Sequence, residues 1–241
     1  MKNVWLKLII LAAIVFSVGS LSAKSVMDVY MEGGFFMHII TGLLIVMLVL
    51  AIVKFWTLQI KEKIDAKGFY LKLKGYVKNG QIEEAVKISS QFKTTTIGFI
   101  FWSGLLGFKD AKASGKKGAE MQNATQNAFN EASLQAIPHL EAGLFWLDIV
   151  AQVATLLGLL GTIFGLIAAF EALANAPEAE KSILLTEGIS QAMGTTAYGL
   201  VVAIPTMFIK GGLQARADKI VNEIDEYSVK IINQVSYSIK D

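Results

Sequence analysis

The sequence of 241 residues contains no cysteine, only three prolines and only two histidines. The lack of cysteine excludes disulfides and thiolate metal sites. The two histidines, His38 and His139, are far apart and have no ligand-like pattern around them, so no metal site is expected. Charged residues are also scarce, at 17 %, whereas hydrophobic residues reach 54 % and the mean hydropathy is +0.51. Because a soluble domain is about a quarter charged, some of these apolar side chains must face lipid.

Sequence signatures of catalysis are missing as well. The chain has no glycine-rich phosphate loop with its Lys-Ser/Thr pair, no HExxH motif and no nucleophile elbow. We therefore expect neither an enzyme nor a bound cofactor. The net charge of +2 is not read as a nucleic-acid signal, because the position of the lysines along the chain explains it better.

The first apolar stretch, residues 4–23, has the parts of a secretory signal peptide. Lys2 and Lys7 stand at its start, a short apolar run follows, and Ser20-Leu21-Ser22-Ala23 ends it. Cleavage after Ala23 is the favoured interpretation, and an uncleaved extra span is the alternative.

Three further stretches approach the roughly 20 apolar residues that a spanning helix needs. They are residues 33–57, 144–170 and 188–209. A shorter apolar run, residues 97–108, has about half the needed length. It lies between Lys93 and Lys109, so it is predicted to be buried or interfacial rather than spanning.

The lysines predict how these spans are oriented. Twelve of them lie between the first mature span and the next, and five basic residues follow the last span. The link 171–187 contains only Lys181 against four glutamates. Because positive residues collect on the cytoplasmic side, the long loop and the tail are predicted to be cytoplasmic and the mature N-terminus periplasmic, in a bacterial inner membrane.

Together these signals predict an all-α integral membrane protein, with three mature transmembrane helices extended by long cytoplasmic helices. The expected parts are a signal peptide (1–23), a periplasmic N-terminus with the first transmembrane helix (24–60), a cytoplasmic helical loop (61–141), a transmembrane helix pair with a short periplasmic link (142–209) and a cytoplasmic amphipathic helix (210–241).

Local patterns predict the cytoplasmic helices. Asn79-Gly80 separates two periodic segments, 69–77 and 82–92. After a polar linker, a long helix is expected from Ala119 into the third apolar stretch, with a kink at Pro138. In the tail, apolar residues recur at alternating steps of four and three, which predicts a helix packed on the protein's own cytoplasmic helices. They are Leu213, Ala217, Ile220, Ile224, Tyr227 and Ile231.

The last two spans carry small residues at helical spacing, which favours close packing of helices in lipid. In the third apolar stretch these are Gly158, Gly161, Gly165 and Ala169, and in the fourth they are Gly188, Ala192, Thr196, Gly199 and Ala203. Polar residues also lie at membrane depth: Thr155, Thr162, Gln191, Thr195 and Thr196. Each threonine could bond a carbonyl of its own helix. For the whole set, a polar path is an equally supported interpretation.

Two long motifs resemble those of a known family. Residues 156–165, LLGLLGTIFG, are similar to the LLGLLGTVxG core of the MotA/TolQ/ExbB proton channel family. Residues 188–205 resemble its second motif, GIxEALxxTAxGLxxAIP, and Glu32-Gly33-Gly34 resembles the family's start. The resemblance covers residues 31–56 and 137–235. It is nearer to ExbB/TolQ than to MotA, because MotA-like subunits have four spans.

The resemblance implies a homopentamer around the transmembrane helices of an ExbD/TolR-like single-span partner with a membrane aspartate. Proton flow would drive a movement that the partner, with a TonB- or TolA-like protein, delivers to the outer membrane. The family's pore-facing threonines fall on Thr162 and Thr196, with Thr195 and Gln191 predicted beside them.

Two positions depart from the family pattern. Gln191 stands where family members commonly have a glutamate, and Thr155 stands where a proline is common. Glutamine cannot carry a titrating proton, so the hypothesis places the titrating carboxylate on the partner. A non-conducting scaffold and a sodium-driven channel remain alternatives, and the energised pathway is left open.

Two carboxylates flank the predicted path. Glu187 could collect cations at the mouth, or it could be a solvated interfacial residue. Asp148 could relay protons at the exit, or it could pair with a nearby lysine or reach interfacial water.

Overall fold

The structure of the chain is a computed structural model that describes residues 34–238, without the side chains at positions 175 and 236–238. All regular secondary structure in this range is helical, which confirms the all-α prediction. The predicted signal peptide and the residues Glu32 and Gly33 lie outside the described range.

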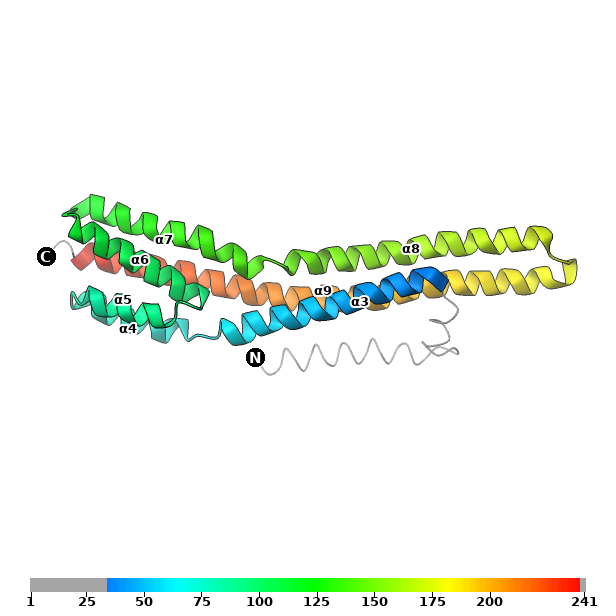
Figure 1. The fold of residues 1–241 in the computed structure, drawn as a ribbon, viewed down its shortest axis with the longest axis horizontal. Coiled ribbons are helices and arrows are strands. Elements are labelled where there is room, and N and C mark those ends of the chain that lie inside the picture. The colour runs from blue at the N-terminus through cyan, green and yellow to red at the C-terminus, as the bar shows by residue number, and fades with distance from the viewer. Residues whose placement is uncertain (1–33, 239–241) are drawn as a thin grey trace. The chain divides into compact units, whose positions relative to one another are not determined.

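The helices follow one another through short turns (Figure 1). They are α3 (Gly34–Trp56), the π-helix η1 (Thr57–Lys61), α4 (Ala66–Lys78), α5 (Ile82–Gln91), α6 (Thr96–Ala113), α7 (Gly118–Glu141), α8 (Leu144–Asn175) and α9 (Glu178–Ser238). The chain forms two compact units. The spanning unit comprises the described part of Met1–Val53 with Gly143–Gly212, and the loop unit comprises Lys54–Ala142 with the described part of Leu213–Asp241.

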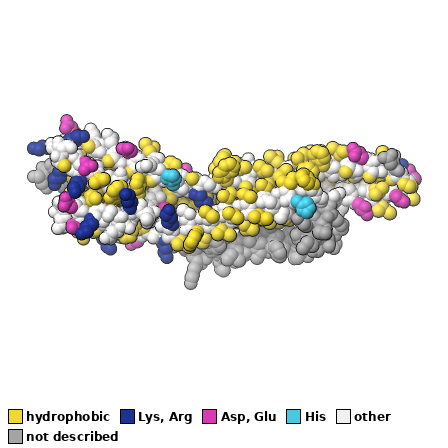
Figure 2. All heavy atoms as spheres, in the orientation of Figure 1, with side chains coloured by type: hydrophobic (Ala, Val, Ile, Leu, Met, Phe, Trp, Pro, Cys, Tyr) yellow, Lys and Arg dark blue, Asp and Glu magenta, His cyan; other side chains and the backbone are white. Residues whose placement is uncertain are grey.

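Three helices of the described chain are long and apolar enough to cross a membrane, which confirms the predicted number of mature spans. They are α3, α8 and the first part of α9. Large apolar side chains stay exposed along them, such as Ile52 on α3, Leu156 on α8 and Met207 on α9. Figure 2 shows these apolar surfaces on α3 and α8, while charged side chains gather over the helices of the loop unit. Exposed apolar side chains at this density fit a lipid environment.

Small side chains bring the helices of the spanning unit together. Ile40 of α3 is buried against Ala151 and Ala154 of α8 and against Val202 and Ala203 of α9. Because alanine adds only a methyl group, the three helices can approach closely at this level.

The loop unit contains the helices that the turn signals predicted. Gly80 adopts a left-handed φ of 72° after α4, where the Asn79-Gly80 pair predicted a turn. In α6, one face of the run 97–108 is buried, and Gly104 lies against the ring of Phe129 on α7. This run is not among the three described helices that could span a membrane, which agrees with the prediction that it is buried or interfacial rather than spanning.

The predicted continuous helix from Ala119 into the third apolar stretch is wrong, because α7 ends at Glu141 and α8 begins at Leu144. Pro138 lies inside α7, and its carbonyl accepts the Ala142 N–H at 2.8 Å, which closes the last turn. Gly143 then takes a φ of 87°, a conformation that side chains rarely tolerate and that ends a helix.

The tail is not a separate helix, because α9 runs without interruption from Glu178 to Ser238. Within the loop unit, the tail residues Leu213, Ala217 and Ile224 are buried, as are Ile220 and Ile231. Tyr227, on the same face, stacks on Tyr70 of α4 with ring centroids 5.0 Å apart. The predicted packing of this stripe on the protein's own helices is confirmed.

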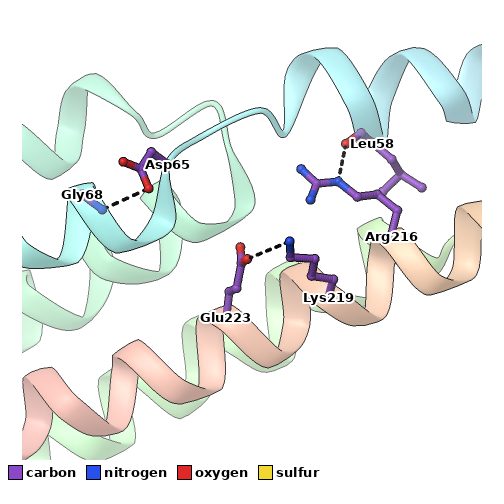
Figure 3. Close-up of polar contacts among 6 residues, drawn as sticks. All are labelled: Leu58, Asp65, Gly68, Arg216, Lys219 and Glu223. Atoms are coloured by element: carbon purple, nitrogen blue, oxygen red, sulfur yellow. Dashed lines mark hydrogen bonds and ion pairs between the residues drawn. The ribbon is translucent and has the colours of Figure 1, made fainter. Parts of the chain in front are cut away.

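The junction between α3 and α4 is held by polar contacts (Figure 3). The Asp65 carboxylate accepts the Gly68 N–H at 3.1 Å and so caps α4. Arg216 on α9 donates from Nε to the Leu58 carbonyl at 3.5 Å. The buried carboxylate of Glu62 accepts both the N–H and the hydroxyl of Thr96, at 2.9 and 3.0 Å, and so ties the junction to the first turn of α6.

Candidate functional site

The site is built where α8 and α9 come into backbone contact. A Cβ atom on Gly199 would lie 2.6 Å from the Ala154 carbonyl oxygen, and one on Gly158 would lie 3.2 Å from the Thr195 carbonyl oxygen. A real Cβ cannot sit 2.6 Å from a backbone oxygen, so Gly199 is required for this approach. The backbone carbonyls of each helix are thereby open to the side chains of the other.

The remaining small residues continue the same interface. A Cβ atom on Gly165 would lie 3.0 Å from the Cβ of Ala192, one on Gly161 would meet the Thr195 methyl group, and one on Gly188 would meet Ala169. The structure therefore brings all six predicted packing residues into one seam: Gly158, Gly161, Gly165, Gly188, Ala192 and Gly199.

Two threonine hydroxyls meet in the middle of this seam. Thr162 and Thr196 share a hydrogen bond, and the Gly158 carbonyl lies within hydrogen-bond distance of both, at 3.1 Å from Thr162 and 2.9 Å from Thr196. The Ala192 carbonyl lies 3.4 Å from the Thr162 hydroxyl. Two hydroxyls carry only two hydrogens, so the cluster has more acceptor oxygens than donated protons. Such a cluster can accept hydrogen bonds from a water molecule or a hydronium ion, or coordinate a cation.

Some of the threonine hydroxyls donate to a carbonyl of their own helix, as the alternative interpretation predicts. Thr155 donates to Ala151 and Thr195 donates to Gln191, each at 3.0 Å and one turn back. Thr196 instead donates across the seam to α8. The bond of Thr196 therefore depends on the tertiary approach of the two helices.

Thr195 and Gln191 have different surroundings from the threonine pair. Thr195 is 2 % exposed, and its methyl group packs against Gly161. Its side chain therefore contributes to the packing of α9 on α8. Gln191 is half-buried, and a Cβ atom on Gly34 would lie 3.4 Å from its amide nitrogen. The amide of Gln191 therefore lies beside the first residue of α3.

Polar residues of α8 share one face that leads away from the cluster. Asp148, Gln152, Thr155 and Thr162 follow one another at steps of four, three and seven residues, which keeps them in line along the helix. Gln152 and Thr155 are exposed and Thr162 is half-buried. At one end of this line, the Asp148 carboxylate pairs with Lys210 of α9 at 3.0 Å. Glu187 is exposed on α9, four residues before Gln191.

The spanning unit contains a second polar contact, which was not predicted from the sequence. The hydroxyls of Thr41 on α3 and Tyr198 on α9 lie 3.0 Å apart, and Thr41 also donates to the Met37 carbonyl at 2.8 Å. Thr41 is the one hydroxyl-bearing side chain in α3, and Tyr198 interrupts the small residues of the second motif. A lone hydroxyl in an apolar helix and a large polar ring among small residues were the features of the sequence that could have indicated this contact.

The Asp148–Lys210 pair allows a test of the two roles considered for Asp148. Asp148→Asn is expected to lower the stability of the purified protein by about 1 kcal/mol or less, because the pair is partly exposed, and to leave ion-driven transport intact. Thermal unfolding and a transport assay on the same preparation measure both effects. Lys210→Gln in the Asp148→Asn background is the matched control, since it removes the unpaired charge. Loss of transport in a stably folded Asp148→Asn protein would instead support an exit relay.

Comparison with known proteins places this seam in a matched region. A model of the MotA/TolQ/ExbB proton channel family matches residues 103–226. The Tol-Pal system protein TolQ of Haemophilus influenzae is 35 % identical over 114 residues, which cover 46 % of this chain and 50 % of that protein. The biopolymer transport protein exbB1 of Vibrio cholerae is 34 % identical over 92 residues, which cover 38 % of this chain and 40 % of that protein.

A third relative is more distant but matches more of the chain. The putative biopolymer transport protein ExbB homolog of Methanothermobacter thermautotrophicus is 24 % identical over 202 residues, which cover 83 % of this chain and 67 % of that protein. The chain spans half or less of the length of the TolQ and exbB1 relatives that it matches.

Proposed function

Because this chain belongs to the MotA/TolQ/ExbB proton channel family, we propose that it is the channel subunit of a motor driven by the proton-motive force. In this proposal, copies of the chain surround the transmembrane helices of an ExbD/TolR-like partner, and ion flow between them drives energised transport or envelope work. A TonB- or TolA-like protein would deliver this work to the outer membrane. The family is one of channel subunits, not of enzymes.

The observation that carries the proposal is the threonine pair on the Gly158 carbonyl. The two threonine hydroxyls and the Gly158 carbonyl bring three oxygens together within spans that are mostly apolar. Polar groups at membrane depth tend to face a bundle interior or a hydrated path. The line of Gln152 and Thr155 on α8 extends these polar groups toward Asp148, and so supports a path along this face.

The partner's role follows from what the two spans lack. Residues 149–170 and 188–209 contain no acidic or basic side chain, and Gln191 cannot release a proton. A membrane aspartate on the partner would supply the titrating group, with Thr162, Gln191 and Thr196 as its polar surroundings. Each charge that crosses 100 mV releases about 2.3 kcal/mol, so a few ions per step suffice for mechanical work.

The orientation belongs to the same proposal. The lysine-rich loop and the tail would be cytoplasmic, with the N-terminus of α3 and the acidic α8–α9 link on the periplasmic side of a bacterial inner membrane. In this orientation Glu187 lies on the periplasmic side of the threonine pair and Asp148 on the cytoplasmic side.

A sodium-driven channel is a second candidate, because neutral hydroxyl, carbonyl and amide oxygens also coordinate sodium. The described cluster consists of such oxygens. Transport that persists with a proton uncoupler but stops without a sodium gradient would favour this candidate.

The native mass of the detergent-extracted complex tests the architecture. The chain is expressed with and without a single-span protein that bears a membrane aspartate, and native mass spectrometry counts the copies. Five copies of this chain together with partner helices are expected. A monomer or dimer whose mass is the same with and without the partner would contradict the proposed motor and would favour a static scaffold.

A further inference from the structure

The turn between α5 and α6, residues 92–95, is tied to the end of the first spanning helix. The buried Glu62 carboxylate holds both the N–H and the hydroxyl of Thr96, directly after this turn. Glu62 follows Trp56, the last residue of α3, by six residues that are almost wholly helical. Because a π-helix rises less than the 1.5 Å per residue of an α-helix, Glu62 lies less than about 9 Å past Trp56, near the outer edge of the headgroup layer.

Apolar and basic side chains surround this point. The interfacial patch comprises Ile60, Lys61, Lys63, Phe92, Lys93 and Trp102. Ile60 is 56 % exposed, Phe92 is 39 % exposed, and the three lysines are also exposed. The Lys93 ammonium group lies 3.7 Å from the centroid of the Trp102 ring. Lysine heads over aromatic and aliphatic side chains are typical of surfaces that lie in the membrane interface.

The acidic residues beside the patch do not neutralise it. Glu62 is buried under Thr96, and the Asp65 carboxylate caps α4 through the Gly68 N–H (Figure 3). No ion pair within residues 34–238 joins Lys61, Lys63 or Lys93 to a carboxylate. The Glu62 and Asp65 carboxylates are thus held by N–H and hydroxyl groups, and the exposed lysines give the patch its positive charge.

We propose that the interfacial patch docks on the membrane surface and binds the phosphates of anionic phospholipids through Lys61, Lys63 and Lys93. Ile60 enters the boundary between headgroups and acyl chains, together with the exposed edge of Phe92, whose ring also packs against Phe69. The patch continues directly from a membrane span, which favours lipid over a soluble protein as its occupant. This inference requires only that α3 is inserted in a bilayer. It can therefore be tested independently of the proposed ion coupling.

The absence of cysteine in the chain permits a direct depth measurement. Thr94→Cys places one label on the α5–α6 turn, and Gln81→Cys places the control label on the α4–α5 turn at the other end of α5. The two positions are separated by a ten-residue helix, about 15 Å long. The full chain is reconstituted in phosphatidylcholine vesicles with and without phosphatidylglycerol, and quenching by spin-labelled lipids is compared at the two positions.

We expect lipid quenching at position 94 that grows with phosphatidylglycerol, and little quenching at position 81. The variant Lys61→Gln/Lys63→Gln/Lys93→Gln should lose this dependence, since each lysine near an anionic surface contributes about fivefold. The variant Lys78→Gln/Lys87→Gln/Lys112→Gln removes the same charge elsewhere in the loop unit and should keep the dependence. Equal quenching at the two positions would overturn the docking, and quenching independent of phosphatidylglycerol would overturn the binding of anionic headgroups.

Discussion

The double variant Thr162→Val/Thr196→Val is expected to lose more than about a hundredfold of ion-driven activity while the complex still assembles. Valine has the shape of threonine but no hydroxyl, so the seam keeps its packing and loses the oxygens that meet at the Gly158 carbonyl. Hydrogen bonds to a charged species are each worth about 1.5–3 kcal/mol. Loss of two such bonds raises the barrier by at least about 3 kcal/mol, which is a hundredfold in rate.

Proton flux into vesicles that contain the co-purified complex measures this effect, with native mass as the check on assembly. Thr206→Val is the matched control, because Thr206 is buried on the same helix and donates only to its own Val202 carbonyl. Thr162→Ser/Thr196→Ser keeps both hydroxyls and should retain most of the flux. Undiminished flux in the double valine variant would show that the polar-path hypothesis is wrong.

Gly199→Ala is expected to destabilise the contact between α8 and α9 strongly, because the added methyl group meets backbone atoms. The added methyl group would lie 2.6 Å from the Ala154 carbonyl oxygen and 3.1 Å from the Gly158 Cα, so α8 and α9 must move apart. Overpacking of this kind costs about 1–3 kcal/mol. The separation would also carry Thr196 away from the Gly158 carbonyl, so ion flux should fall together with stability.

Thermal unfolding of the detergent-solubilised protein, followed by size-exclusion chromatography, measures the stability change. Gly211→Ala is the control on the same helix, because a Cβ atom there meets nothing within 4 Å. Since alanine favours helix over glycine by about 1 kcal/mol, this control should be neutral or slightly more stable. A Gly199→Ala protein as stable as the Gly211→Ala protein would contradict the backbone contact between α8 and α9.

The two predictions separate the roles of the glycines and the threonines. The glycines set the distance between the helices, whereas the threonines supply chemistry that this distance makes available. A scaffold would need the glycines alone. A channel needs both, so valine substitutions that spare assembly but stop ion flux are the result that distinguishes a motor subunit from a static anchor.

Three features could be predicted from the sequence alone: the number of spans among the described residues, the small-residue seam and the stripe in the tail. Each of these depends on the composition or periodicity of one segment, which burial of an apolar face or contact with lipid selects directly. The turn at Gly80 was equally local, because a left-handed residue needs only its own lack of a side chain.

Which polar groups meet could not be predicted from the sequence. Three such contacts depend on the rotation of each helix about its axis. They join Asp148 to Lys210, Thr41 to Tyr198, and Thr196 to α8. They also depend on the distance between helices, which the periodicity of one helix does not contain. The break at Gly143 was missed for a related reason: glycine is tolerated within a helix, and only the actual backbone conformation distinguishes a packing glycine from one that ends it.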